Sequence, residues 1–260
     1  MNICGIVNLP IVGIKNLNSD LEYYKKFVNS IEIKFDYPFG PLSITRKQIK
    51  TIKDMLSSYN FNVILHAPWV FTNLLVPPSK IFNMFLDEIK TSSKIAILLD
   101  SELITIHLGN YSVYQNNEVN ELVNRAIKSL ERISNENSLI ISIENMDIKN
   151  SFRRGFPLTI DEIMIVYNSD LKLTLDTGHA FLMGENPSKI FSRFNDKILN
   201  IHLHDSTKSE AHLSLGSGFF DYKTFIRELE RNKYNHYLCL ELIKRNDFEK
   251  SLNELKKLLH

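Results

Sequence analysis

The chain of 260 residues contains six short apolar segments that end in side chains able to bind a metal ion or move a proton. These side chains are His66, His107, Glu144, Asp176 with His179, His202 with His204, and Glu241. Imidazole and carboxylate ligands without thiolate favour Zn²⁺ or Mn²⁺, whereas an all-oxygen set favours Mg²⁺ or Ca²⁺. The pattern therefore predicts a divalent-metal site for Zn²⁺ or Mn²⁺, with Co²⁺, Fe²⁺ and Mg²⁺ as alternatives and no organic cofactor.

The repetition of these segment ends carries the prediction, because a single histidine beside a strand is usually an ordinary structural residue. Burying so many ionisable groups around one opening costs several kcal/mol each unless they are paired or metal-bound. Further along the chain, Glu210 and His212 precede a segment with Gly216 and Gly218. These glycines either let the backbone approach a ligand closely or form an ordinary turn.

The apolar segments themselves predict the elements that hold these side chains. Eight β-branched runs are candidate strands: Ile3–Val7, Ser30–Phe35, Asn62–Leu65, Leu103–Ile106, Leu139–Ile143, Leu171–Leu175, Ile198–Leu203 and Tyr237–Leu240. Apolar residues at helical spacing predict the helices Thr45–Ser58, Lys80–Leu99, Val119–Ile133, Ile160–Tyr167, Tyr222–Arg231 and Asp247–Leu259. Alternating strands and helices are typical of a parallel sheet, whose strands need long crossovers.

Eight strands of this kind predict a closed sheet. A doubly wound open sheet is the alternative, but the chain lacks the glycine-rich loop that usually follows the first strand of that fold. We therefore expect an α/β fold, a single (β/α)8 TIM barrel that spans residues 1–260 as one domain. The carboxyl ends of barrel strands share one rim, where barrel enzymes keep their active sites.

The composition excludes several classes of protein. With 31 basic and 30 acidic residues, the net charge of +1 does not indicate a general nucleic-acid binder. No apolar run approaches the roughly 20 residues of a membrane span. Cys4 and Cys239 are too few for a disulfide scaffold, so we expect packed thiols in a cytoplasmic protein, with a single bridge as the alternative. The loop at 70–80 is a candidate cover for the site or an interface in a homo-oligomer.

Several short motifs follow the same order and spacing as in a known superfamily. They are HAP at 66–68, EN at 144–145, LDTGHA at 175–180, HLHD at 202–205, HLSLGSGFFDY from His212, and LEL at 240–242. Together they resemble the xylose-isomerase-like TIM barrels, over about residues 60–260. That superfamily contains sugar isomerases and epimerases as well as apurinic endonucleases of the endonuclease IV type.

Resemblance to the sugar enzymes implies one metal ion bound by four residues: Glu144, Asp176, His202 and Glu241. The two glutamates would exchange protons with the carbon beside a sugar carbonyl, through an enediolate. The resemblance further implies a substrate-orienting role for His179. Trp69, Lys208 and His204 are candidate substrate contacts, with plain packing as the alternative for Trp69. Lys208 stands where members often have arginine, and it lacks the bidentate fork of that residue. The expected substrate is a sugar or sugar phosphate.

Resemblance to endonuclease IV implies three metals that activate a hydroxide against DNA phosphodiesters. Their ligands would be His66, His107, Glu144, Asp176, His179, His202, Glu210, His212 and Glu241, with Glu210 in place of an aspartate. Other family features are absent: strand one runs into Val7, Met146 follows the Glu-Asn pair, and Gly178 replaces a cysteine. We therefore favour the isomerase or epimerase, with the nuclease and a non-catalytic metal-binding barrel as alternatives. Arg153 and Arg154 are candidate phosphate ligands or a solvated surface pair.

Overall fold

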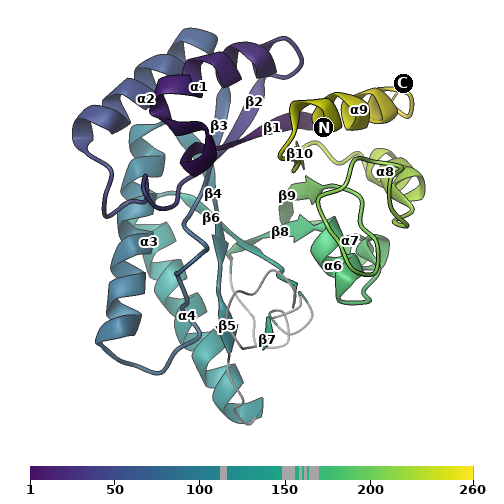
Figure 1. Cartoon of the computed structure of the whole chain (residues 1–260). Coiled ribbons are helices and arrows are strands. Elements are labelled where there is room, and N and C mark those ends of the chain that lie inside the picture. The colour runs from purple at the N-terminus through teal and green to yellow at the C-terminus, as the bar shows by residue number, and fades with distance from the viewer. Residues whose placement is uncertain (112–115, 148–155, 158–159, 161–162, 164–169, 260) are drawn as a thin grey trace.

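The fold is a closed barrel of eight parallel strands surrounded by helices, in a computed structural model that describes residues 1–111, 116–147, 156, 157, 160, 163 and 170–259 (Figure 1). The barrel strands run in the order β1-β10-β9-β8-β6-β4-β3-β2, and every adjacent pair is parallel. Their bounds are β1 Asn2–Asn8, β2 Ser30–Lys34, β3 Asn62–His66, β4 Ser101–His107, β6 Ile140–Glu144, β8 Lys172–Asp176, β9 Ile198–Leu203 and β10 Tyr237–Leu240. The expected (β/α)8 barrel is confirmed, as is each of its strands.

Helices follow most of the strands. Their bounds are α1 Leu9–Lys25, α2 Arg46–Tyr59, α3 Lys80–Leu98, α4 Asn116–Asn137, α6 Thr177–Leu182, α7 Pro187–Phe194, α8 Tyr222–Arg231 and α9 Arg245–Lys256. Five of the six predicted helices are present at nearly the predicted bounds, whereas α1, α6 and α7 were not predicted. The predicted helix Ile160–Tyr167 falls largely outside the described residues, and so do Arg153 and Arg154. A small antiparallel pair, β5 Asn110–Tyr111 and β7 Phe156–Pro157, lies beside the barrel.

Local sequence signals determine where several helices begin. At the start of α2, the Thr45 hydroxyl accepts a hydrogen bond from Gln48 N at 3.2 Å, and the Gln48 side chain accepts one from Thr45 N at 2.8 Å. This reciprocal capping box satisfies two backbone donors that the first turn would leave free. Ser79 caps α3 by accepting from Phe82 N at 3.2 Å.

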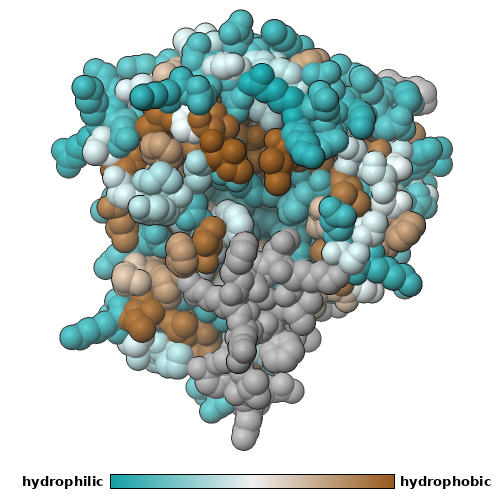
Figure 2. Space-filling model, viewed as in Figure 1, coloured by the Kyte–Doolittle hydropathy of each residue, from teal (hydrophilic) through white to brown (hydrophobic). Residues whose placement is uncertain are grey.

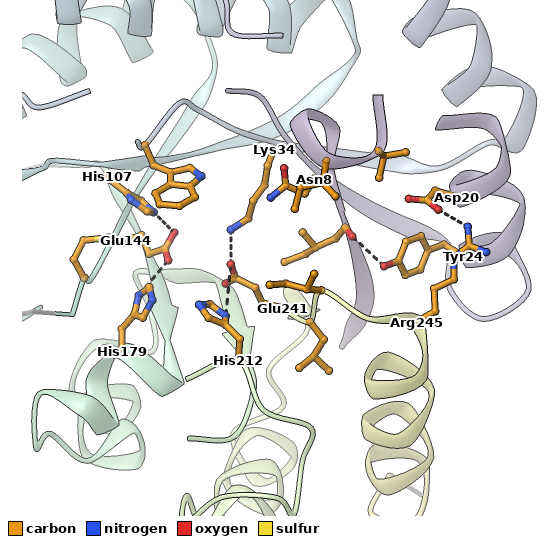
Figure 3. Close-up of a pocket in the computed structure, with 17 residues that line it drawn as sticks. Asn8, Asp20, Tyr24, Lys34, His107, Glu144, His179, His212, Glu241 and Arg245 are labelled. Atoms are coloured by element: carbon orange, nitrogen blue, oxygen red, sulfur yellow. Dashed lines mark hydrogen bonds and ion pairs between the residues drawn. The ribbon is translucent and has the colours of Figure 1, made fainter. Parts of the chain in front are cut away.

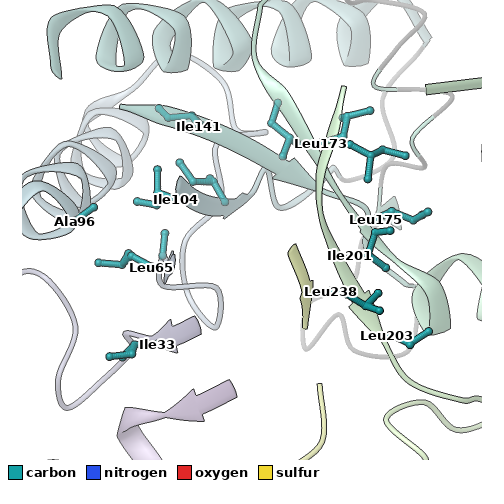
Figure 4. Packing of buried hydrophobic residues seen from close by; sticks show 14 of the residues in the cluster. Ile33, Leu65, Ala96, Ile104, Ile141, Leu173, Leu175, Ile201, Leu203 and Leu238 are labelled. Atoms are coloured by element: carbon teal, nitrogen blue, oxygen red, sulfur yellow. The ribbon is translucent and has the colours of Figure 1, made fainter. Parts of the chain in front are cut away.

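The strands bury both of their faces. Outward-facing residues pack against the helices in a continuous aliphatic layer that includes Ile33, Leu65, Ile104 and Leu173 (Figure 4). Alternate residues point into the barrel, because successive side chains of a strand lie on opposite faces. This arrangement explains why the strands read as nearly continuous runs of Ile, Leu and Val.

The interior of the barrel changes character from one end to the other. Near the amino ends of the strands it is filled by a small cluster that contains Cys4, Leu103 and Cys239. Cys4 and Cys239 are register partners on β1 and β10, and both are buried free thiols, as expected. Farther along the strands, Thr105 and Thr174 belong to a polar layer that leads to the rim.

None of the helices within the described part of the chain is long and apolar enough to cross a membrane.

Candidate active site

The predicted residues meet at the carboxyl ends of the barrel strands. His66, His107, Glu144 and Asp176 are the last residues of β3, β4, β6 and β8, and Glu241 directly follows β10. All five are at least nine-tenths buried. Thus alternation along each strand and closure of the sheet bring residues that are far apart in sequence to one rim (Figure 3).

Three groups of side chains each bring their potential ligand atoms within 4.8 Å of one another. The central group contains Glu144, Asp176, His202 and Glu241. The histidine group contains His66, His107 and Glu144, so Glu144 belongs to both groups. The third group contains His204, His212 and Glu241. The central group is the four-residue set implied by the sugar enzymes, and the histidine group contains two of the residues that only the nuclease resemblance assigned to a metal.

The potential ligand atoms of the central group lie close to one another. His202 Nδ1 lies 2.8 Å from Glu241 Oε2 and 3.2 Å from Glu144 Oε1. Even so, neither His202 Nδ1 nor Glu241 Oε2 has a hydrogen-bond partner among the described residues, although both are buried. Buried polar atoms are almost always satisfied. The close approach of these atoms, two of which lack a hydrogen-bond partner, fits a divalent cation.

The histidine group leads to a similar conclusion. His66 Nδ1 lies 2.8 Å from the carbonyl oxygen of Ala67, which can only accept, so Nδ1 carries a proton. In the neutral ring, His66 Nε2 is then an acceptor that faces another acceptor, Glu144 Oε2, at 3.2 Å. Glu144 Oε2 also lies 2.9 Å from His107 Nε2. A proton or a metal ion between His66 Nε2 and Glu144 Oε2 would remove the repulsion between these two acceptors.

Burial and opposite charges shift the titration of the central group. Burial alone would raise the pKa values of Glu144 and Glu241, but His202 beside both and Lys34 beside Glu241 lower them well below the usual range. Burial alone would lower the pKa of His202, but Glu32, Glu144 and Glu241 raise it well above its usual value. The carboxylates are therefore ionised at neutral pH, and the site attracts cations.

In contrast to His202, the side chains of His107 and His212 are neutral at neutral pH. Burial is the main cause that lowers the pKa of His107, and burial together with the nearby His204 ring lowers that of His212 to about 4. A neutral imidazole keeps the lone pair that metal binding requires.

His204 lies behind Asp176. Its Nδ1 accepts a hydrogen bond from the backbone N–H of His212 at 2.9 Å, and its Nε2 lies 3.0 Å from Asp176 Oδ1. Because Nδ1 is an acceptor, the proton of the neutral ring is on Nε2, which donates to Asp176. Both nitrogens are thus engaged, and His204 is not among the described residues that line the cavity. His204 was predicted to contact the substrate, whereas in the structure it holds Asp176 and does not line the cavity.

Gly178 makes room for this histidine. A Cβ atom at Gly178 would lie 2.0 Å from His204 Cε1. Gly178 replaces a cysteine of the endonuclease pattern, and any side chain at this position would displace His204.

The remaining predicted residues divide between the cavity and the surface. Trp69 and His179 line the cavity, and the Trp69 ring centroid is 6.2 Å from that of His107. Lys208 and Glu210 are exposed in the loop after β9, and Glu210 belongs to none of the three groups found among the described residues.

The glycines after His212 form a turn around one carboxylate. Gly216 N and Gly218 N each donate to Asp205 Oδ2 at 2.9 Å. These contacts support the turn interpretation of the glycines.

Two charged residues of β2 were not predicted as part of the site. Lys34 is buried, lines the cavity and donates to Glu241 Oε1, while the fully buried Glu32 contacts His202. Burial alone would lower the pKa of Lys34, but Glu241 and Glu144 raise it above its usual value. The available signal was the alternation in the segment SIEIK, whose charged residues both fall on the inward face.

One cavity of about 430 Å³ opens onto these groups (Figure 3). Lys34, Glu144 and Glu241 line its polar side, and Ile11 and Ile243 belong to an apolar side. Figure 2 shows hydrophobic side chains gathered along the edge of the hollow. A volume of this size lies within the range of small-molecule sites.

Comparisons with known proteins agree with the fold. A family model described as xylose isomerase-like TIM barrel matches residues 25–258. An uncharacterized protein of Methanocaldococcus jannaschii is 30% identical, in an alignment that covers 94% of this chain and 94% of that protein. A probable endonuclease 4 of Staphylococcus aureus is 22% identical, in an alignment that covers 83% of this chain and 87% of that protein.

The solved structures show the same architecture. The crystal structure of a D-tagatose 3-epimerase-like protein superposes with a TM-score of 0.82 at 23% identity, covering 100% of this chain and 97% of that one. The family match over most of the chain agrees with the closed barrel. The chain therefore belongs to the xylose isomerase-like TIM barrel family.

Proposed function

We propose that this barrel, acting as one domain over residues 1–260, is a divalent-metal-dependent isomerase or epimerase of a sugar or sugar phosphate. The observation that supports the proposal most directly is the position of Glu144 and Glu241. Both carboxylates line one cavity, and both lie beside His202 Nδ1, at 3.2 Å and 2.8 Å. Similarity of the fold to a D-tagatose 3-epimerase-like protein supports a sugar as the substrate.

In the proposed reaction, one of the two glutamates removes the proton from the carbon beside the sugar carbonyl. In an isomerisation, the same carboxyl group then returns the proton to the neighbouring carbon. In an epimerisation, the other glutamate takes up a proton from solvent and delivers it to the opposite face of the same carbon, while the first glutamate releases its proton to solvent. A positioned acid or base accelerates such transfers by about 10²–10⁴-fold. His179 and Trp69, which line the same cavity, would orient the hydroxyls and cover the ring.

The central group would hold the metal ion through Glu144, Asp176, His202 and Glu241. Zn²⁺ or Mn²⁺ fits this mixture of imidazole and carboxylate, with Co²⁺, Fe²⁺ or Mg²⁺ as alternatives. When bound, such an ion polarises a substrate carbonyl and stabilises the negative charge that develops on oxygen. Lys34 adds a fixed positive charge to the same side of the cavity and holds Glu241 Oε1.

Solvent exchange tests the proposal. Metal-loaded protein is incubated with a panel of ketoses, aldoses and their phosphates in deuterated water, and deuterium at the carbon beside the carbonyl is measured. We expect exchange with at least one sugar, and a loss of about 10²–10⁴-fold in Glu144→Gln. Absence of exchange with every sugar would contradict the proposal.

An apurinic endonuclease is the second candidate. It is supported by the histidine group, which offers a second metal position that shares Glu144 with the central group. Against it stands Glu210, which is exposed and apart from the other proposed ligands. Cleavage of a duplex that contains one abasic site tests this candidate: nicking that EDTA abolishes would favour the nuclease, and an intact duplex would exclude it.

A further inference from the structure

Glu32 is a fully buried carboxylate in the middle of β2, inside the barrel and two residues before Lys34. Its oxygens lie 3.1 Å and 3.0 Å from His202 Nε2. Asn200 Nδ2 donates to Glu32 Oε2 at 2.9 Å. Glu32 is not among the described residues that line the cavity, so it faces the histidine and has no contact with the space for substrate.

This contact determines which nitrogen of His202 faces the central group. A carboxylate accepts hydrogen bonds, so His202 Nε2 carries the proton and donates it to Glu32. His202 Nδ1 is then directed toward Glu144 and Glu241, and it is the nitrogen that has no hydrogen-bond partner among the described residues. A metal ion takes the place of a proton on one ring nitrogen. Because Nε2 keeps its proton for Glu32, Nδ1 is the nitrogen left to bind the metal.

His66 shows the opposite arrangement. Its Nδ1 donates to the carbonyl oxygen of Ala67 at 2.8 Å, which leaves Nε2 to face Glu144. The two histidines therefore present different nitrogens to the shared carboxylate, and in each the choice follows from the partner of the other nitrogen. At His66 that partner is a backbone carbonyl, whereas at His202 it is the side chain of Glu32.

We propose that Glu32 is a positioning residue that fixes the ring of His202, with Nε2–H toward Glu32 and Nδ1 toward the metal. This inference rests on the metal site proposed above. Partners of this kind orient a ligating imidazole and increase its basicity, and their loss typically weakens metal binding by about 10–100-fold. Glu32 would therefore control metal affinity without touching either metal or substrate.

Nuclear magnetic resonance of the wild-type protein with isotope-labelled histidine tests the ligand atom directly. After saturation with Zn²⁺, we expect the signals of His202 to show coordination through Nδ1 and a proton on Nε2. Coordination through Nε2, or no bound Zn²⁺, would overturn the inference. This measurement needs no variant, so it is unaffected if a substitution at Glu32 prevents folding.

Competition with a chelator tests the role of the side chain. We expect Glu32→Ala to weaken Zn²⁺ binding by about 10–100-fold, and Glu32→Gln, which keeps an acceptor oxygen, to weaken it less. Glu102→Gln is the matched control, because Glu102 is an exposed strand carboxylate that contacts the Tyr237 hydroxyl outside the site. Equal affinity of Glu32→Ala and the control would overturn the inference. Failure of sugar exchange would contradict the isomerase alone, since these measurements contain no sugar.

Discussion

Replacement of Gly178 by alanine should displace His204 and destabilise the protein. The added Cβ would lie 2.0 Å from His204 Cε1 and 2.3 Å from its Nδ1. The ring cannot move without cost, because the His212 N–H and Asp176 hold its two nitrogens. Overpacking costs about 1–3 kcal/mol. A hydrogen bond to a charged group contributes about 1.5–3 kcal/mol.

Alanine is favoured over glycine in a helix by about 1 kcal/mol, which reduces the loss. We therefore expect Gly178→Ala to lower the free energy of unfolding by about 2–5 kcal/mol. Urea denaturation of metal-free protein, followed by circular dichroism, measures this change. Gly40→Ala is the control, because the nearest heavy atom to a Cβ there would be 3.6 Å away, an ordinary van der Waals contact. A change in the free energy of unfolding within about 0.5 kcal/mol is expected for this variant. Equal stability of the two variants would refute the packing described for His204.

Three further predictions concern charge and metal binding. Lys34→Met removes the buried partner of Glu241, so the metal-free variant should lose about 3–5 kcal/mol in the free energy of unfolding. Zn²⁺ should then raise the melting temperature of this variant more than that of the wild type. An equal rise in both proteins would contradict the pairing of Lys34 with Glu241. His107→Ala should remove any ion of the histidine group while the central group keeps its own, as metal analysis would show; loss of all metal would contradict separate positions. His212 has a pKa of about 4 against 6.5 for the free group, so the unfolded chain binds its proton first and stability should fall as the pH falls through this window. In metal-free protein, His212→Gln should show a smaller fall between neutral pH and pH 4 than the wild type, and an equal fall would count against the prediction.

The barrel could be predicted from the sequence because each strand is buried on both faces and reads as an apolar run. The rim could be predicted because most strand runs end in a residue such as Glu144 or Asp176. By contrast, α6 could not be predicted from periodicity, because its six residues, Thr177–Leu182, are too few to show a helical repeat. α1 was missed because Pro10 and the non-helical Gly13 interrupt its pattern.

The site could be predicted only where polar residues end an apolar run. Glu32 lies inside the strand segment SIEIK and Lys34 ends it. Charged residues that alternate with Ile in this way resemble a solvated face until closure of the barrel turns them inward. His202 and His204 are two residues apart and look equivalent in sequence. β9 ends at Leu203, however, so the chain leaves the strand before His204 and places it behind Asp176.

We propose that Glu144, Asp176, His202 and Glu241 together hold a divalent metal ion at the carboxyl rim of the barrel. The test is metal analysis of the purified wild type and of Asp176→Ala after dialysis against metal-free buffer. We expect one or two ions per wild-type chain and one fewer in Asp176→Ala. A wild-type protein without metal, or with three ions, or an unchanged count in the variant would contradict it.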